Sequence, residues 1–428
     1  MLLNEETVMT SPHTAVAVTH EPPAIPGFNR ALLALCALNF FMADVQAGIG
    51  PFLGVFLQRH GWQTGPIGTV MTVGGIAGML ATIPAGALID HTTKKRLLVI
   101  VAALCTISAS LLLLSSQAVP VVTVSQLATA LAGAGMGPLM AAITLGIVRQ
   151  KGFNTQIGRN QAWNHAGNMA GAGLSGWLGW QFGLSAIFFL EVAFGLFAIS
   201  AVLLIPEKSI DHKAARGLDD KPVHDEGTAE GLRSFLRHKP LLILASCLCF
   251  FHLGNAAMLP LYGMAVVSAG KGNPAMFTAM TVMVAQAVMI VVSLLAIRFV
   301  RDRGYWIVLL ISFAALSLRG LIAGSFIQHW GVWPVQILDG IGAGLQSVAV
   351  PGLVARLLNG TGRINIGQGI VMTAQGIGAS LSPALGGWLA EDLGYTVAFY
   401  TLGCFAIVSL GLWIGSASIL RSADQVSA

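Results

Sequence analysis

Apolar segments that are each long enough to cross a lipid bilayer recur twelve times along this chain of 428 residues. A helix of about 20 residues spans the hydrocarbon core, and inside lipid a helix satisfies its own backbone hydrogen-bonding groups. Only 10% of the residues are charged, whereas about 25% are charged in a typical soluble domain. The predicted membrane spans are 31–57, 64–88, 97–116, 120–148, 160–182, 184–206, 240–268, 275–299, 304–326, 331–357, 366–390 and 394–420. The sequence therefore predicts an all-α polytopic membrane protein and excludes a soluble protein with a large core.

Polar stretches set the predicted domain boundaries. Residues 207–239 carry mixed charges between the sixth and seventh spans, which is typical of a linker between two six-helix bundles at 28–206 and 240–420. Residues 1–27 are polar and have no basic start, so we expect a disordered tail and not a cleaved signal peptide. Residues 421–428 are expected to form a second tail.

Positive charge lies almost entirely on one side of the predicted membrane. Of 23 Lys and Arg residues, 20 fall on the side of the linker and both termini. Arg59 and Lys271 fall on the other side, and Arg319 lies within a span. Lys and Arg concentrate in cytoplasmic loops, which predicts a plasma membrane protein (inner membrane in a bacterium) with both termini cytoplasmic. The bases are scattered without a basic face, so the lipid bilayer is an expected partner and nucleic acid is not.

The two halves of the chain resemble each other. The segment "GAGLSGWLGWQFGLSAIFF" (171–189) aligns without a gap on the segment that begins at Ser382, at a constant offset of 211. Gly176 matches Gly387 and Trp177 matches Trp388 in this alignment. Duplicated six-helix halves joined by a linker are a transporter architecture, with the binding site near the bilayer midplane between the repeats.

A charged loop, "GALIDHTTKKR" (86–96), interrupts the apolar pattern after the second span. It resembles the signature Gly-x-Leu-x-Asp-x-x-Gly-x-Lys-Arg of the major facilitator superfamily, with His91 and Thr93 in place of the usual arginine and glycine. The segment "RFVRDRGYW" (298–306) is similar to a decayed second copy. The resemblance covers Phe28 to about Arg421. It implies two pseudo-symmetric bundles, a cavity lined by helices 1, 4, 7 and 10, and transport of a small-molecule substrate by alternating access.

The resemblance also implies a cytoplasmic gate. Its residues would be Gly86, Asp90, Lys95, Arg96 and Arg149. Asp90 is expected to meet the positive N-terminal end of helix 11 near 367–369, with Arg149 as an alternative partner. In helix 11, "GIGASLSPALGGWL" (376–389) is similar to a glycine–proline pattern of antiporters in this superfamily, which favours export.

Ionisable groups inside a membrane span are expensive and are functional candidates by default. The proton-coupling candidates are Asp44, His165, His252 and Asp339. Arg319 and Asp339 lie at similar depths on consecutive helices, so we expect a buried ion pair. Glu191 falls on an outer helix and is expected to be structural.

Neutral polar side chains on the expected cavity helices supply hydrogen-bonding capacity. The substrate-cavity candidates are Gln46, Asn164, Asn168, Asn255, Gln286 and Gln375. Asn164 and Asn168 are four residues apart and should share a helix face. The scarcity of fixed charge favours a neutral, amphipathic or weakly charged substrate. Small residues let helices approach closely, and the resemblance implies that the glycine-rich helices 5 and 11 pack on helices 8 and 2, where the halves slide.

The first functional hypothesis is a proton-coupled exporter that works as a monomer. A proton symporter that imports an organic acid or nutrient is the alternative, and a receptor or scaffold is a third class. No nucleophile–base motif, metal-ligand spacing or phosphate-binding loop is present in the sequence, so we expect no enzyme, no cofactor and no metal. The five cysteines all fall in apolar stretches and are expected to be free thiols.

Overall fold

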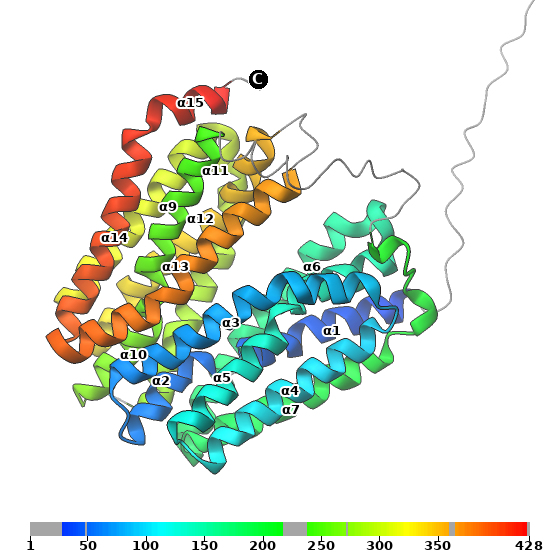
Figure 1. Cartoon of the computed structure of the whole chain (residues 1–428), viewed down its shortest axis with the longest axis horizontal. Coiled ribbons are helices and arrows are strands. Elements are labelled where there is room, and N and C mark those ends of the chain that lie inside the picture. The colour runs from blue at the N-terminus through cyan, green and yellow to red at the C-terminus, as the bar shows by residue number, and fades with distance from the viewer. Residues whose placement is uncertain (1–27, 48, 217–237, 271–272, 359–363, 426–428) are drawn as a thin grey trace, which may run out of the picture.

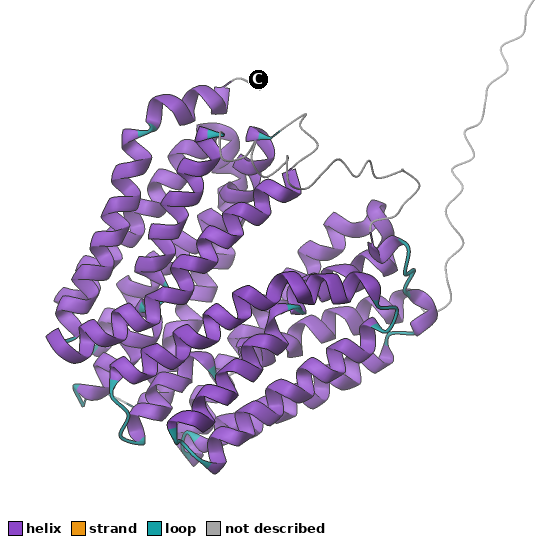
Figure 2. Cartoon of the chain, viewed as in Figure 1, coloured by secondary structure: helices purple, strands orange, loops and turns teal. Residues whose placement is uncertain are grey.

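The computed structural model describes residues 28–47, 49–216, 238–270, 273–358 and 364–425, and every regular element among them is a helix (Figure 2). The N-terminal half comprises α1 (Phe28–Ala47), α2 (Gly50–Arg59), α3 (Thr64–His91), α4 (Lys95–Ser115), α5 (Val119–Ala134), α6 (Met136–Phe182) and α7 (Ser185–Leu204). Two short 3-10 helices follow, η1 (Glu207–Ser209) and η2 (Ala214–Arg216). The C-terminal half comprises α9 (Lys239–Asn255), α10 (Met258–Ser268), α11 (Pro274–Ser325), η3 (His329–Gly331), α12 (Val332–Leu357), α13 (Ile364–Leu393), α14 (Tyr395–Gly415) and α15 (Ala417–Gln425).

The two halves form the arms of a V (Figure 1). At the point of the V, α2 contacts α10, α3 contacts α13, and α6 contacts α11; we call this the closed end. The other end, which carries the segment after α7 and the turns at Arg149 and Gly304, is called the linker end, and there the halves stand apart (Figure 1). The expected packing of helix 5 on helix 8 and of helix 11 on helix 2 is therefore confirmed.

Three predicted spans are broken, each near its middle. Span 31–57 divides between α1 and α2, span 120–148 between α5 and α6, and span 240–268 between α9 and α10. In each case the first helix ends four or five residues before a proline: Pro51, Pro138 and Pro260. Proline has no N–H and clashes with the carbonyl four residues earlier, which explains why the helix stops there and restarts.

Two long helices join consecutive membrane spans: α6 joins the end of span 120–148 to span 160–182, and α11 joins spans 275–299 and 304–326. Within α6 the backbone turns at Arg149, whose φ of 53° is the only positive value of a non-glycine residue in the described part of the chain. Within α11 the turn is at Gly304, with φ 77°. Nine described segments are long and apolar enough to cross a membrane, and Pro274–Ser325 is long enough for two. The other two predicted spans, 160–182 and 366–390, fall outside that set because they are richer in Gly, Asn and Gln.

The last span ends earlier than predicted. Helix α14 stops at Gly415, and α15 continues past residue 420 as a separate helix. The Arg421 guanidinium lies 3.8 Å from the ring centre of Trp306, which fixes α15 against α11. The Trp413 indole N–H donates to Trp306 O at 3.0 Å in the same region.

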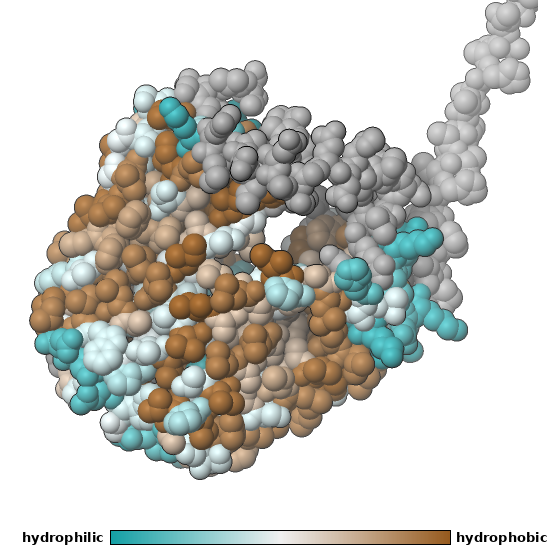
Figure 3. Space-filling model, viewed as in Figure 1, coloured by the Kyte–Doolittle hydropathy of each residue, from teal (hydrophilic) through white to brown (hydrophobic). Residues whose placement is uncertain are grey.

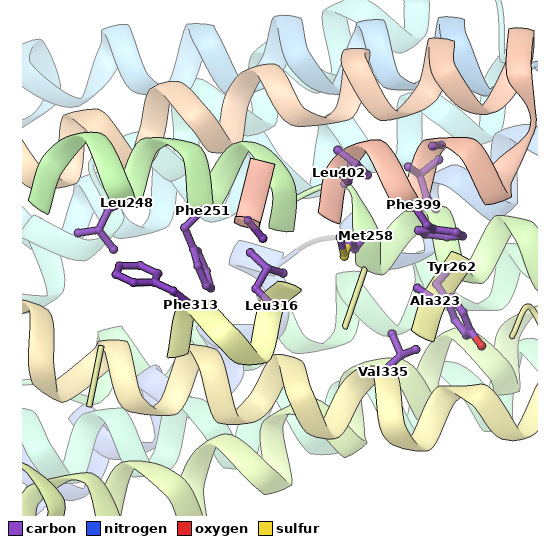
Figure 4. Packing of buried hydrophobic residues seen from close by; sticks show 14 of the residues in the cluster. Leu248, Phe251, Met258, Tyr262, Phe313, Leu316, Ala323, Val335, Phe399 and Leu402 are labelled. Carbon is purple, nitrogen blue, oxygen red and sulfur yellow. The ribbon is translucent and has the colours of Figure 1, made fainter. Parts of the chain in front are cut away.

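Packing of the C-terminal half extends across the closed end. In Figure 4, Phe251 of α9 packs on Phe313 of α11, with ring centres 5.8 Å apart, and Tyr262 of α10 packs on Phe399 of α14 at the same separation. The same buried cluster includes Phe52 to Leu57 of α2, so the closed end is part of a hydrophobic core. On the surface, apolar residues dominate between polar residues at the two ends of the molecule (Figure 3). This distribution is what a multi-pass membrane protein requires.

Candidate functional site

An acidic residue, Asp44, lies beside the break between α1 and α2 in the N-terminal half. Asp44 is half-buried one turn before the end of α1 and lies directly against Gly171 of α6, where an added Cβ would overlap Asp44 Oδ1. Gly167, one turn earlier, approaches Phe40 O in the same way. These contacts bring α6 close to α1, and within the described residues we find no hydrogen bond or ion pair to the Asp44 carboxyl.

A second buried acid, Glu191 of α7, interacts electrostatically with Asp44. Glu191 is 2% exposed, and the Ser110 hydroxyl donates to Glu191 Oε1 at 2.9 Å. Glu191 Oε2 is buried and has no partner in the described part of the chain. The two carboxyls interact electrostatically, and α1 packs on α7. The sequence analysis expected Glu191 to be structural and did not anticipate its interaction with Asp44, because the two acids lie on different helices far apart in sequence.

In the C-terminal half, a buried ion pair lies next to the end of α9, where the break between α9 and α10 begins. Arg319 is fully buried, and its Nη1 lies 3.0 Å from Asp339 Oδ1. Asn255, the last residue of α9, donates from Nδ2 to Asp339 Oδ1 at 3.2 Å and accepts from Arg319 Nη1. Arg319 Nη2 also donates to Gln336 Oε1 at 3.3 Å. The structure thus brings together Arg319, Asp339 and Asn255 from three helices, and it adds Gln336, which the sequence analysis did not single out.

His252 lies one turn before Asn255 on α9. It interacts electrostatically with Asp339, and its Nε2 is buried without a hydrogen-bond partner among the described residues. Two of the proton-coupling candidates, His252 and Asp339, therefore belong to one cluster, and Asp44 belongs to the other half.

A polar contact at mid-depth joins the two halves. His165 Nδ1 of α6 lies 2.9 Å from Gln286 Oε1 of α11. Asn168 Nδ2 donates to Asn164 Oδ1 at 3.2 Å, so these two side chains share a face of α6. The remaining cavity candidates are Gln46, exposed on α1, and Gln375, half-buried on α13. No single cluster contains all six candidates.

Hydrogen bonds across the closed end were not anticipated from the sequence. Gln58 Nε2 of α2 donates to Ser268 Oγ at 2.7 Å and to the Tyr395 hydroxyl at 3.0 Å. Gly65 N–H donates to Glu391 Oε2 at 2.7 Å, and the Trp388 indole donates to Thr69 Oγ1 at 3.0 Å. These bonds join residues more than 200 positions apart, so no local pattern could have indicated them.

The expected gate residues lie at the linker end. Asp90 is in the last turn of α3, but its side chain lies outside the described part of the structure. The linker ends of α3 and α13 stand apart (Figure 1), and added Cβ atoms at Gly86 and Gly369 would meet nothing within 4 Å. Arg149 forms its ion pair with Asp211, at 2.9 Å.

The ion pair between Arg149 and Asp211 holds the segment after α7 against the N-terminal half. The backbone N–H groups of Ala214 and Lys213 and the Arg149 guanidinium hold the pKa of the Asp211 carboxyl below its usual value. Asp211 N–H donates to Gly146 O at 2.9 Å. In this conformation Arg149 therefore orders the start of the linker.

Lys95 is expected to stabilise the end of α3. Its side chain is 1% exposed, and Nζ donates to Ile89 O at 2.6 Å and to Thr92 O at 3.1 Å. Lys95→Met removes these charged hydrogen bonds from buried carbonyls and should lower the free energy of unfolding by about 1.5–3 kcal/mol. Unfolding of the purified protein in detergent measures the loss, and Lys94→Met, at an exposed neighbour, is the control. Equal stability of the two variants would contradict this role.

The described residues include no group of three or more His, Cys, Asp or Glu side chains that could hold a metal ion. All five cysteines are free in the structure. The polar side chains around Asp44 and around Asp339 place carboxyl groups and hydrogen-bond donors and acceptors inside the two bundles.

Comparisons with known proteins agree with this architecture. The family described as Major Facilitator Superfamily matches residues 35–366. Two relatives, both uncharacterized MFS-type transporters of Mycobacterium tuberculosis (strains CDC 1551 / Oshkosh and ATCC 25618 / H37Rv), are each 37% identical over 378 residues, which cover 88% of this chain and 90% of theirs.

Solved structures show the same fold at low identity. A variant of the nucleoside transporter NupG superposes with a TM-score of 0.77 at 12% identity, covering 90% of this chain and 99% of that one. A bacterial homolog of the human lysosomal transporter Spinster, in an inward-facing and unoccupied conformation, superposes with a TM-score of 0.72 at 14% identity, covering 94% and 99%. The chain is therefore a multi-pass membrane protein that belongs to the Major Facilitator Superfamily of secondary transporters.

Proposed function

We propose that this transporter exports a small organic solute in exchange for protons, as a monomer, with its linker end in the cytoplasm. The orientation is supported by the 20 Lys and Arg residues assigned to that side of the membrane. With this orientation the transporter acts in the plasma membrane of the cell, which is the inner membrane in a bacterium. In this orientation the end at which the two halves stand apart (Figure 1) faces the cytoplasm.

The observation that carries the proposal is the pair of acids Asp44 and Glu191. Neither has a basic partner among the described residues, and a charged carboxylate inside a membrane is expensive. Two carboxylates that interact inside the same bundle repel each other when both are charged, which favours states in which at least one of them is protonated. Ser110 donates to Glu191, which is almost fully buried, so Asp44, which is less buried, is the group that exchanges the proton with water.

The position of Asp44 links its charge to the conformational change. It lies next to the break between α1 and α2, and broken helices near the midplane are where transporters place their coupling sites. Because α1 is pressed on α6 at Gly171, a change in the charge of Asp44 acts directly on a helix that contacts the other half. Release of the proton to the cytoplasm would precede solute binding, and uptake of a proton from outside would follow solute release.

Solute binding is assigned to the polar side chains at mid-depth. His165 and Gln286 come from opposite halves, and Asn164 and Asn168 extend the same face of α6. On the other side, Asn255 and Asp339 are only partly buried. These groups present mostly neutral donors and acceptors, which suits a neutral or weakly charged organic solute.

Transport by proteoliposomes under an imposed pH gradient tests the coupling. Asp44→Asn should abolish solute movement driven by the gradient while leaving exchange of solute down its own concentration gradient, because the variant cannot release a proton. Asp302→Asn is the matched control, since Asp302 is an exposed acid paired with Arg301 at 3.1 Å. An Asp44→Asn variant that responds to the pH gradient as the wild type does would overturn the assignment.

The direction of proton flow separates export from import. In an antiporter, solute efflux from the proteoliposome is coupled to proton influx. In a symporter, solute and protons cross the membrane in the same direction. A pH-sensitive dye trapped in the vesicles reports the sign. Proton and solute movement in the same direction would replace the export proposal by the importer, with the same acids in the coupling role.

A further inference from the structure

A pocket of about 280 Å³ lies at the linker end of the N-terminal half, away from the surfaces on which the two halves meet. Its walls come from the start of α4, the end of α7 and the segment that follows α7. The lining combines the basic side chains of Lys94, Arg96 and His212 with the apolar side chains of Leu97, Leu203 and Ile210. The transport path described above uses none of this space.

The polar part of the pocket suits an anion. Arg96 donates from Nη2 to Leu203 O at 3.1 Å. A guanidinium has four N–H donors on its two Nη atoms, so the other three can donate to a ligand. Lys94 is exposed beside it. Helix α4 begins here with no side chain capping its N-terminus, which adds a partial positive charge. Glu207 is the one acid in the lining.

The apolar part of the pocket continues into the lipid-facing surface. On α4, Leu97, Val101 and Leu104 are 50%, 53% and 47% exposed, and on α7, Leu203 and Leu204 are 55% and 70% exposed. Figure 3 shows the same change, from apolar surface to polar surface, toward the linker end of this half. The pocket thus lies where hydrocarbon gives way to the headgroup layer.

The segment that follows α7, which forms the third wall of the pocket, is held against α6 by its own contacts. An added Cβ at Gly146 would lie 2.9 Å from Ile210 Cγ2, so this segment packs tightly on α6. Asp211 forms the ion pair with Arg149 and accepts N–H bonds from Lys213 and Ala214. The pocket is therefore preformed and needs no ordering of a loop before it binds a ligand.

We propose that this pocket binds the phosphodiester headgroup of an anionic phospholipid, with the acyl chains along the exposed leucines of α4 and α7. Basic pockets between membrane helices are known to bind such headgroups. Glu207 selects the phosphodiester over free phosphate, because a phosphodiester carries one negative charge and leaves hydroxyl groups of the headgroup to donate to the carboxylate. The Glu207 carboxylate would repel the second negative charge that free phosphate carries on its oxygens.

Native mass spectrometry of the purified protein, titrated with phosphatidylglycerol or with phosphatidylcholine of the same acyl chains, tests the proposal. The wild type should retain one phosphatidylglycerol more tightly than phosphatidylcholine. Lys94→Gln should weaken retention of that lipid about fivefold, and Lys94→Gln with His212→Gln should weaken it further, because each base near the headgroup layer contributes about 1 kcal/mol. Arg301→Gln with Arg303→Gln, at exposed positions of the other half's linker end, is the matched control and should leave retention unchanged.

Three results would overturn the lipid site. One is equal retention of the two lipids by the wild type. Another is unchanged retention in the Lys94 and His212 variants while their unfolding temperatures match the wild type. The third is displacement of the bound lipid by inorganic phosphate alone, which would make the pocket a phosphate site. Glu207→Gln extends the test, since it should strengthen competition by inorganic phosphate.

Discussion

Asp339→Asn should destabilise the protein by about 3–5 kcal/mol, because it leaves the fully buried Arg319 guanidinium without a carboxylate. Asn255 and Gln336 would remain as acceptors, but both are neutral. Arg319→Gln should cost less, since the Asp339 side chain is 14% exposed and can be hydrated or protonated when its partner is lost. The expected order of destabilisation follows from the unequal burial of Arg319 and Asp339.

A double-mutant cycle measures whether the two residues act as a pair. Arg319→Gln together with Asp339→Asn removes both charges, and the loss of stability should be clearly smaller than the sum of the two single losses. Unfolding of the protein in mixed detergent micelles, followed by tryptophan fluorescence, gives the free energies. Arg301→Gln with Asp302→Asn is the control, since that pair is 76% and 59% exposed and should contribute under about 1 kcal/mol. Additive losses at Arg319 and Asp339 would refute the pairing.

Gly68→Ala should open the closed end. A Cβ at Gly68 of α3 would overlap Pro383 O of α13, and one at Gly387 would overlap Thr64 O. These contacts join the two halves. The overpacking should therefore destabilise the conformation of Figure 1 by about 1–3 kcal/mol and leave the folding of each bundle unaffected. The population of this conformation relative to its alternatives should fall about 5- to 150-fold.

Spin labels at Gln63 and Asp392, both exposed at the closed end, report the separation of the two halves in a cysteine-depleted background. Gly68→Ala should shift the label distances to longer values. Gly167→Ala is the informative comparison, because its Cβ would overlap Phe40 O within the N-terminal bundle. It should lower stability without lengthening the label distance. An unchanged distance distribution in Gly68→Ala would show that the α3–α13 contact yields without separating the halves.

Much of the fold could be predicted because the signals are local. The twelve spans follow from lengths of apolar sequence, since a bilayer rejects unpaired backbone groups whatever the tertiary packing. The repeat at an offset of 211 is also visible in the contacts: Gly167 approaches Phe40 O, and its counterpart Gly378 approaches Cys249 O. The breaks near Pro51, Pro138 and Pro260 were missed, although each proline is a local signal for the end of a helix.

The candidate sites were predictable only in part. Ionisable residues inside spans stand out by their cost, and the depth argument that paired Arg319 with Asp339 needed only a helix rise and a short connection. Glu191 was expected to be structural because it falls on an outer helix, and its interaction with Asp44 was not anticipated because it depends on the packing of α7 on α1. Arg149 was assigned to a gate, but it pairs with Asp211 of the segment after α7.

The sequence by itself determined the membrane spans, their duplication and the side that carries the positive charge, because each of these depends on the transfer of residues between water and lipid. Tertiary structure alone decided which polar groups interact: Asp44 with Glu191 electrostatically, and Gln58 with Tyr395 and His165 with Gln286 through hydrogen bonds. Such contacts depend on the rotation of each helix about its axis and on the close approach at Gly68, Gly167 and Gly171. In lipid no hydrophobic force fixes that rotation, so close packing of small residues and hydrogen bonds between helices have to set it.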